Sequence, residues 1–212
     1  MQTHSLLRID CAAALLGASP PPGWVTEALL RAPWVVVRRA PLQDGLLPVG
    51  VRGAVRAARF AAWLPPGRVR ECLTPLQLAA RRDWRGHPRS RQFSALAAVA
   101  GVESIMARAR LAARWGPGGS VAFELASGCA TVTAASDLDL IVQPEACLPP
   151  TAARELLQQL AQLPARIDVV LETPGGAVAL REYARARAPF LARTPEGPRL
   201  LHDPWAGAAA AA

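Results

Sequence analysis

The stretch "SDLDLIV" at residues 136–142 limits the possible folds of this chain more than any other part of the sequence. Polar and apolar residues alternate in it, which is typical of a strand with one buried face. Because strand side chains alternate between faces, Asp137 and Asp139 lie on one face, about 6.5–7 Å apart along the backbone. The leucines lie on the other face. The sequence therefore predicts a sheet with two carboxylates at the start of a buried strand.

Two further features accompany these aspartates. Asp168 interrupts an apolar strand predicted over 165–173, and it stands beside the first two acids if the two strands pair. Upstream, Gly119 and Ser120 belong to a glycine-rich turn, which we expect to follow a strand at 112–115. The backbone amides of such a turn can bind a phosphate group, and the serine hydroxyl can donate a further hydrogen bond.

Two carboxylates this close repel each other unless a cation lies between them. Hard cations such as Mg²⁺ or Mn²⁺ take a few carboxylates together with water and phosphate oxygens. The aspartate pair alone is more often a solvated strand end, but the turn, the pair and the third acid together are more specific. We therefore predict Asp137, Asp139 and Asp168 as catalytic and metal-binding residues, with Gly119 and Ser120 binding the substrate.

Charge is unevenly distributed along the chain, which has a net charge of +8. Residues 1–114 carry 17 arginines and 6 acids, whereas residues 115–212 carry 7 arginines and 10 acids. This asymmetry suggests an anionic partner held by the first half and chemistry performed by the second, although a solvated arginine-rich surface gives the same pattern. Arg39 and Arg52 lie at the ends of predicted strands and are candidates for binding substrate phosphates.

The pattern of elements predicts an α+β fold. A small N-terminal α/β domain, with strands at 33–40 and 46–53, precedes a mixed sheet with flanking helices. Residues 55–64 form either a short helix or a third strand. The expected division is a basic N-terminal domain at 1–80, a basic linker at 81–94, a catalytic domain at 95–205 and a disordered tail at 206–212.

Within the second domain we expect a long helix that starts near Ser94, a helix at 151–163 and another near 176–187. A final hairpin turns at Glu196 and Gly197. Residues 121–127 are compatible with either a helix or a strand.

Several functional classes are disfavoured. No apolar run is long enough to span a membrane, so we expect no membrane partner. The four cysteines lack the spacing of metal or redox motifs, and the three histidines lie far apart, which argues against a zinc site. Free thiols are typical of a reducing compartment, and we expect a cytoplasmic protein.

Gly119, Ser120, Asp137 and Asp139 together resemble the pattern of the nucleotidyltransferase superfamily. Longer stretches extend the resemblance over nearly the whole chain. They are similar to malonate decarboxylase holo-acyl-carrier-protein synthase, a family also called phosphoribosyl-dephospho-CoA transferase. These stretches are "VVVRRA", "LPVGVRG", "RWGPGGSVAFELASG", "TAASDLDLIV", "RIDVVLETPGGAVALREYAR" and "FLARTPEGPRLLHDPW".

The resemblance implies a nucleotidyltransferase-like second domain and a specific reaction. Such enzymes use triphosphoribosyl-dephospho-CoA to modify a serine of the apo acyl carrier subunit of malonate decarboxylase, and diphosphate leaves. In this sequence the resemblance gives the metal-binding role to Asp137 and Asp139, with Asp168 as a further catalytic acid. Mg²⁺ or Mn²⁺ is the implied cofactor, and no nucleic acid partner is implied.

Other interpretations stay open from sequence. The same superfamily pattern serves nucleotidyl transfer to another acceptor, such as the citrate lyase carrier, a small molecule or RNA. The net charge also suits a basic RNA-binding module, but aromatic residues are few and no RNA-binding motif is present. An interaction protein with an inactive transferase fold is a third possibility, against which the intact acids argue.

Overall fold

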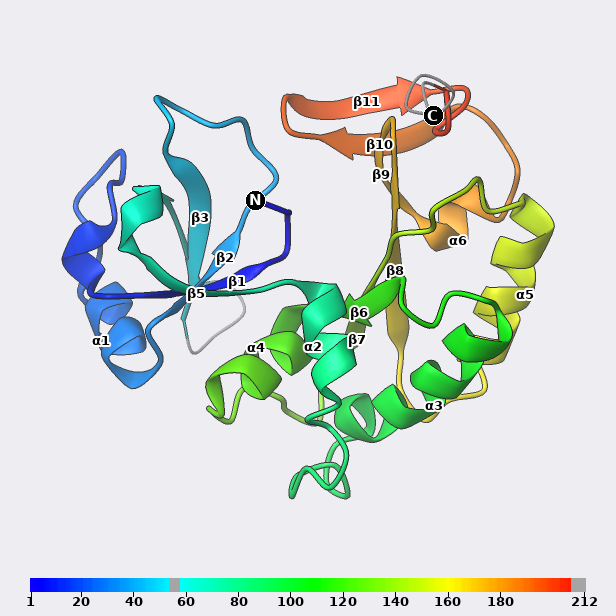
Figure 1. Cartoon of the computed structure of the whole chain (residues 1–212), viewed down its shortest axis with the longest axis horizontal. Coiled ribbons are helices and arrows are strands. Elements are labelled where there is room, and N and C mark those ends of the chain that lie inside the picture. The colour runs from blue at the N-terminus through cyan, green and yellow to red at the C-terminus, as the bar shows by residue number, and fades with distance from the viewer. Residues whose placement is uncertain (54–57, 207–212) are drawn as a thin grey trace. The chain divides into compact units, whose positions relative to one another are not determined.

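The computed structural model describes residues 1–53 and 58–206 (Figure 1). They form two compact units. The first comprises Met1–Thr74 with Phe123–Thr131, and the second comprises Pro75–Ala122 with the described residues from Val132 onward. Each unit has its own sheet with associated helices, so the predicted α+β class is confirmed.

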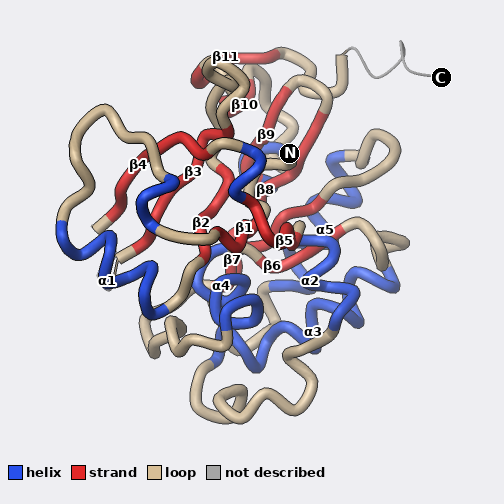
Figure 2. The backbone as a smooth tube through the Cα atoms, turned by 60° about the vertical axis from the view of Figure 1, so that its left-hand side comes forward, coloured by secondary structure: helices blue, strands red, loops and turns tan. Residues whose placement is uncertain are grey.

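The first unit is built on a five-stranded antiparallel sheet in the order β4-β3-β2-β1-β5, whose strands lie side by side in Figure 2. Its strands are β1 (Leu6–Ile9), β2 (Trp34–Val37), β3 (Leu47–Arg52), β4 (Arg59–Leu64) and β5 (Val69–Leu73). Its helices are α1 (Gly23–Arg31) and two 3₁₀ turns, η1 (Ala12–Ala14) and η2 (Pro66–Arg68).

Apolar β-branched residues hold the first sheet against α1. Val35 and Val49 are fully buried, and Val25 and Leu29 of α1 join the same core cluster. Burying each such side chain stabilises the fold by about 1.5–3 kcal/mol. The β-branched residues of "WVVV" and "LPVGVR" thus form the strands that the sequence predicts.

A tight turn connects β2 and β3, and β4 follows β3 in the chain. Asp44 and Gly45 have φ values of 50° and 76°, a left-handed pair that suits a tight hairpin turn. Gln43 and Leu46 close this turn. The segment 55–64 is a strand from Arg59 onward, and its first residues lie outside the described part of the chain.

The second unit is built on a six-stranded mixed sheet in the order β11-β10-β9-β8-β7-β6. Strands β7 and β8 are parallel, and the other described neighbours are antiparallel. The strands are β6 (Trp115–Pro117), β7 (Leu138–Val142), β8 (Ile167–Thr173), β9 (Gly176–Ala179), β10 (Phe190–Thr194) and β11 (Gly197–Leu201). The helices are α2 (Pro75–Arg81), α3 (Ser94–Arg108), α5 (Pro150–Leu160) and α6 (Leu180–Tyr183), with α4 (Gly119–Ser127) beginning here.

Helices α3, α5 and α6 lie along one side of this sheet, on its right in Figure 1. Helix α5 connects the parallel strands β7 and β8, as a parallel pair requires. Leu138, Leu140 and Leu171 are fully buried in the sheet. Helix α3 continues through Gly101. The missing Cβ atom at this position leaves room for Leu163, which packs closely against the helix.

Two local predictions need correction, and one open alternative is decided. The strand expected at 112–115 is β6, which starts only at Trp115 and includes the first glycine of the turn. The helix expected near 176–187 is instead strand β9 followed by the short helix α6, because residues 176–179 pair with β8. Residues 121–127, compatible with either element from sequence, belong to helix α4.

The basic segment predicted as a linker at 81–94 is ordered by its own contacts. Trp84 is 3% exposed and stacks at a tilt on Trp115, with 5.8 Å between the ring centroids. Arg82 and Arg85 both pair with Glu103 of α3 at 2.5 and 2.8 Å. Much of the arginine charge of this segment is therefore paired within the second unit.

Within residues 1–53 and 58–206, no helix combines the length and apolar character that a membrane crossing needs. All but the first residue of the predicted tail at 206–212 lies outside the described residues.

Candidate active site

The three predicted carboxylates gather at the start of β7 and β8. The parallel register pairs Asp139 with Asp168, so their side chains project from the same face of the sheet. Asp137 precedes β7 directly and lies two residues from Asp139. The side chains of Asp137 and Asp168 are 23% and 40% exposed, which leaves both open to a ligand. The pairing expected from sequence is therefore present in the fold.

The predicted glycine-serine turn lies against Asp139. The Gly118 N–H donates to the Asp139 backbone carbonyl at 2.8 Å. Gly119 has a φ of +58°, and a Cβ atom there would collide with Oδ2 of Asp139. Gly119 starts helix α4, whose first amides have no partner within the helix and carry partial positive charge. The second residue of α4, Ser120, is buried, with 5% exposure.

Two arginines cover the carboxylates from the solvent side. Arg166 lies between Asp137 and Asp168, with its Nε 3.9 Å from Oδ2 of Asp137 and its Nη2 3.2 Å from Oδ2 of Asp168. Arg181 donates to the other oxygen of Asp168, Oδ1, at 3.5 Å. Both arginine side chains are more than 60% exposed. The site is thus a cluster of three acids and two exposed arginines.

The backbone of the two arginines is fixed although their side chains are exposed. The carbonyl of Arg166 accepts the Leu138 N–H at 2.9 Å, which ties it to β7. Arg181 lies on α6, and Tyr183 of the same helix donates its hydroxyl to the Leu148 carbonyl at 2.7 Å. The Trp205 Nε1 donates to the same hydroxyl at 3.1 Å. Burial raises the pKa of Tyr183, which keeps this donor protonated.

The loop that leads into Asp137 is also organised by hydrogen bonds. The Ser136 hydroxyl accepts the Thr133 N–H at 3.0 Å, and the Ser136 N–H returns to the Thr133 carbonyl at 3.0 Å. Arg89 donates to the Val132 carbonyl at 2.7 Å and stacks over Phe93 with 4.5 Å to the ring centroid. Arg89, a basic residue of the predicted linker, therefore helps to hold the loop that leads to Asp137.

The three acids fit a divalent cation in the kind of ligand that they offer. Carboxylate oxygens are the ligands that magnesium and manganese prefer, and three of them start neighbouring strands beside a glycine that leaves space at Asp139. Among the described residues, no three His, Cys, Asp or Glu side chains are arranged to hold a metal ion as they stand. Closing such a ligand set requires side-chain rotation, since Asp168 is engaged with Arg166 and Arg181.

The predicted phosphate-binding arginines belong to the first unit. Arg52 is the last residue of β3, opposite Arg59 on β4, and Arg39 follows β2. The neighbouring Arg38 is used within the sheet, where its Nε donates to the Val49 carbonyl at 2.8 Å and its guanidinium lies 5.5 Å over the Trp63 ring. Burial lowers the pKa of Arg38. Substrate binding by Arg39 and Arg52 stays a prediction.

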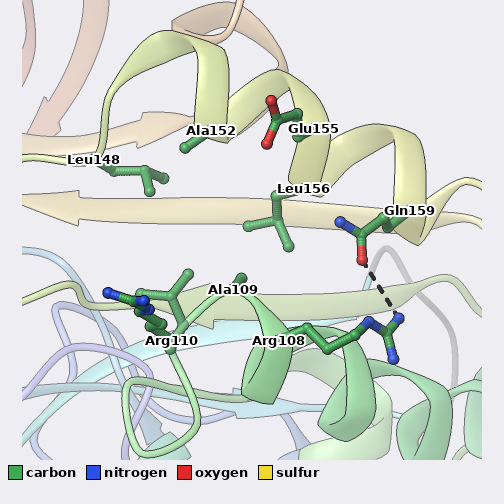
Figure 3. A pocket seen from close by; sticks show the side chains of 9 residues that line it. Arg108, Ala109, Arg110, Leu148, Ala152, Glu155, Leu156 and Gln159 are labelled. Atoms are coloured by element: carbon green, nitrogen blue, oxygen red, sulfur yellow. Dashed lines mark hydrogen bonds between the residues drawn. The ribbon is translucent and has the colours of Figure 1, made fainter.

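A separate cavity of about 220 Å³ lies between the end of α3 and α5 (Figure 3). Arg108 closes one side of it by donating to Oε1 of Gln159 at 3.4 Å. Leu148 and Leu156 point into it from the opposite side. None of the predicted site residues lines this cavity.

Sequence reasoning missed three polar residues near these elements. The position of Arg166 could have been found from sequence, because it stands two residues before Asp168 and therefore shares its strand face. Glu124 could also have been found, as an acid within an apolar helix; it is 1% exposed and accepts the Thr131 N–H at 2.8 Å. Arg181 could not, since its position depends on how β9 passes into α6.

Comparisons with known proteins agree along the whole length of the chain. Residues 2–75 match the N-terminal domain of phosphoribosyl-dephospho-CoA transferase MdcG, and residues 77–204 match the C-terminal domain of the same enzyme. No solved structure matches the chain significantly.

Relatives named phosphoribosyl-dephospho-CoA transferase align over most of both sequences. The Azotobacter vinelandii protein is 40% identical over 99% of this chain and 96% of its own length. The Pseudomonas aeruginosa protein is 41% identical over 90% of this chain and 91% of its own length. The Pseudomonas putida protein is 43% identical over 87% of this chain and 86% of its own length. The chain is therefore a transferase and belongs to the phosphoribosyl-dephospho-CoA transferase family.

Proposed function

We propose that this transferase moves the phosphoribosyl-dephospho-CoA group from 2′-(5″-triphosphoribosyl)-3′-dephospho-CoA to a serine of the apo acyl carrier subunit of malonate decarboxylase. The names of the relatives support the group that is transferred. The observation that carries the chemistry is the parallel register of Asp139 and Asp168, with Asp137 at the same edge. The acceptor and the metal requirement are parts of the proposal.

The reaction forms one bond and breaks one bond at the α-phosphorus of the donor. The serine Oγ forms its bond to that phosphorus while the bond to the diphosphate oxygen breaks. The serine proton passes to a carboxylate of the site or to water, and diphosphate leaves. In such transfers the protein contributes mainly placement and electrostatic stabilisation.

Each part of the site has a role in this scheme. Asp137, Asp139 and Asp168 would hold a magnesium or manganese ion. When bound, the ion would offset charge on the phosphates and on the departing diphosphate. The amides at the start of α4, beginning with Gly119 and Ser120, bind phosphate oxygens in the way that helix N-termini do.

A transfer assay tests the proposal directly. The protein is mixed with MgCl₂, the triphosphoribosyl donor and the purified apo carrier, and the carrier is weighed by mass spectrometry. We expect a mass gain that equals the phosphoribosyl-dephospho-CoA group on the malonate decarboxylase carrier, and a smaller yield on the citrate lyase carrier. No gain on either carrier would refute the transferase proposal.

Asp139→Asn tests the carboxylate role. Loss of this ligand removes several kcal/mol of charge stabilisation, so we expect transfer to slow by about 100-fold or more. Asp83→Asn is the control, because Asp83 is an aspartate of the second unit that pairs with Arg81 and is not one of the site residues. Transfer by Asp139→Asn at the wild-type rate would exclude the assigned role.

A further inference from the structure

Arg166 and Arg181 already contact carboxylate oxygens of Asp137 and Asp168 that a divalent cation would take as ligands. Arg166 donates toward Oδ2 of Asp168, and Arg181 donates to Oδ1 of the same side chain. Arg166 also lies within 3.9 Å of Asp137. These are lone pairs that a divalent ion would need as ligands. The guanidinium groups therefore compete with the ion for the same oxygens.

The competing contacts are weak enough to exchange. The side chains of Arg166 and Arg181 are 65% and 62% exposed, and ion pairs at such exposure add little stability. Their backbone positions are fixed by β7 and by the anchored helix α6, so each guanidinium swings from a constant point. A planar guanidinium matches two oxygens of a phosphate as well as it matches a carboxylate.

We propose that Arg166 and Arg181 are phosphate-binding residues that occupy the carboxylates in the resting enzyme and pass to the substrate phosphates when the cation binds. The exchange keeps both guanidinium groups paired and releases the oxygens of Asp168 to the ion. Binding of the cation and of a phosphate chain is then mutually favourable. This inference rests on the proposed function for the identity of the phosphate-bearing ligand.

Binding titrations with simple probes test the exchange. Manganese alone is titrated first, and inorganic diphosphate is then titrated at saturating manganese, for the wild type and for Arg166→Gln and Arg181→Gln. Loss of a competing charge about 4 Å away should tighten the binding of manganese alone by about 3- to 10-fold. Loss of a phosphate-binding guanidinium should weaken diphosphate binding by about 10-fold.

Conservative variants separate this role from a structural one. Arg166→Lys keeps the positive charge but loses the planar fork. It should therefore bind manganese alone as the wild type does, and bind diphosphate with intermediate affinity. Arg187→Gln removes another exposed arginine of the same unit, beyond α6, and should change neither affinity.

The outcomes decide the inference without reference to turnover. Opposite changes in the two affinities support the exchange. Unchanged manganese affinity in both glutamine variants, or a parallel loss of manganese and diphosphate affinity, would overturn it. If a glutamine variant fails to fold, Arg166→Lys and Arg181→Lys are used instead: unchanged manganese affinity with weaker diphosphate binding supports the exchange, and unchanged diphosphate affinity would overturn it. If the wild type modifies no carrier but the arginine variants show the opposite changes in affinity, only the proposed function is refuted.

Discussion

Gly119 combines an unusual backbone conformation with close contact to a candidate metal ligand, Asp139. Its left-handed φ of +58° costs about 1–2 kcal/mol for a residue with a Cβ atom. The same Cβ atom would also collide with Oδ2 of Asp139. Either Asp139 or the start of α4 must therefore move if Gly119 is replaced.

Gly119→Ala should consequently impair the site more than it impairs folding. We expect the free energy of unfolding to fall by about 1–2 kcal/mol, with a loss of transfer activity and of manganese affinity that the stability change does not explain. Urea unfolding and manganese titration measure the two effects.

Gly128→Ala supplies the control for this substitution. Gly128 has a φ of +71°, and a Cβ atom there would meet nothing within 4 Å. The control should show the backbone cost with unchanged manganese binding. Equal manganese affinities in the two alanine variants would show that the Gly119 contact with Asp139 has no functional weight.

At the scale of residues, sequence reasoning found the acids more readily than their partners. Asp137 and Asp139 were recognisable because the strand period puts both on one face, and Asp168 because an acid is unusual in an apolar strand. Arg181 was not recognisable, since only the tertiary path from β9 to α6 brings it to Asp168.

At the scale of elements, Glu103 of α3 fixes the basic segment that precedes the helix. Hydrogen bonds from Arg85 and Arg82 lower the pKa of Glu103, despite an opposing contribution from burial. A carboxyl whose folded pKa is depressed stabilises the fold above its unfolded pKa of about 4.3. That contribution disappears as the pH falls through the lower, folded pKa.

Glu103→Gln should therefore destabilise the protein by about 1 kcal/mol at pH 7, and the difference from wild type should vanish well below pH 4. Urea unfolding at both pH values measures this. Glu145→Gln is the control, because Glu145 also pairs with an arginine but is 78% exposed. A difference that persists in acid would mean that packing, and not the ion pairs, explains the Glu103 effect.

Elements with a strong sequence period were predictable, whereas elements defined by pairing were not. The strands at 33–40 and 46–53 and the hairpin at Glu196 follow from β-branched runs and turn residues. Residues 176–179 have a helix-compatible composition but form β9, because β8 offers an unpaired edge to them. Tertiary pairing therefore overrides local preference in this part of the sheet.

At the scale of the whole molecule, the charge asymmetry would favour capture of the proposed carrier if that carrier is acidic. The chain carries a net charge of +8, and all of the positive excess lies in residues 1–114, since residues 115–212 are net negative. An acidic carrier would be attracted by this excess before specific contacts form, and salt would screen the attraction.

We therefore expect the KM for the carrier to rise about 3- to 10-fold between about 0.05 and 0.3 M NaCl, with kcat nearly constant. Initial rates at saturating donor measure the effect, since the donor is then bound at both salt concentrations. Sucrose at equal osmolality serves as the control. A KM that does not change with salt would show that net charge plays no part in carrier capture.

The parallel pairing of β7 with β8 has a consequence for length variation in homologous or engineered chains. A slip of one residue would place Ile167 or Val169 opposite Asp139 and turn the Asp168 carboxylate toward the buried face. Insertions and deletions at 161–166, between α5 and β8, must therefore be absorbed as surface bulges. An indel that propagates into the strand would silence the enzyme while its helix and strand content remained intact.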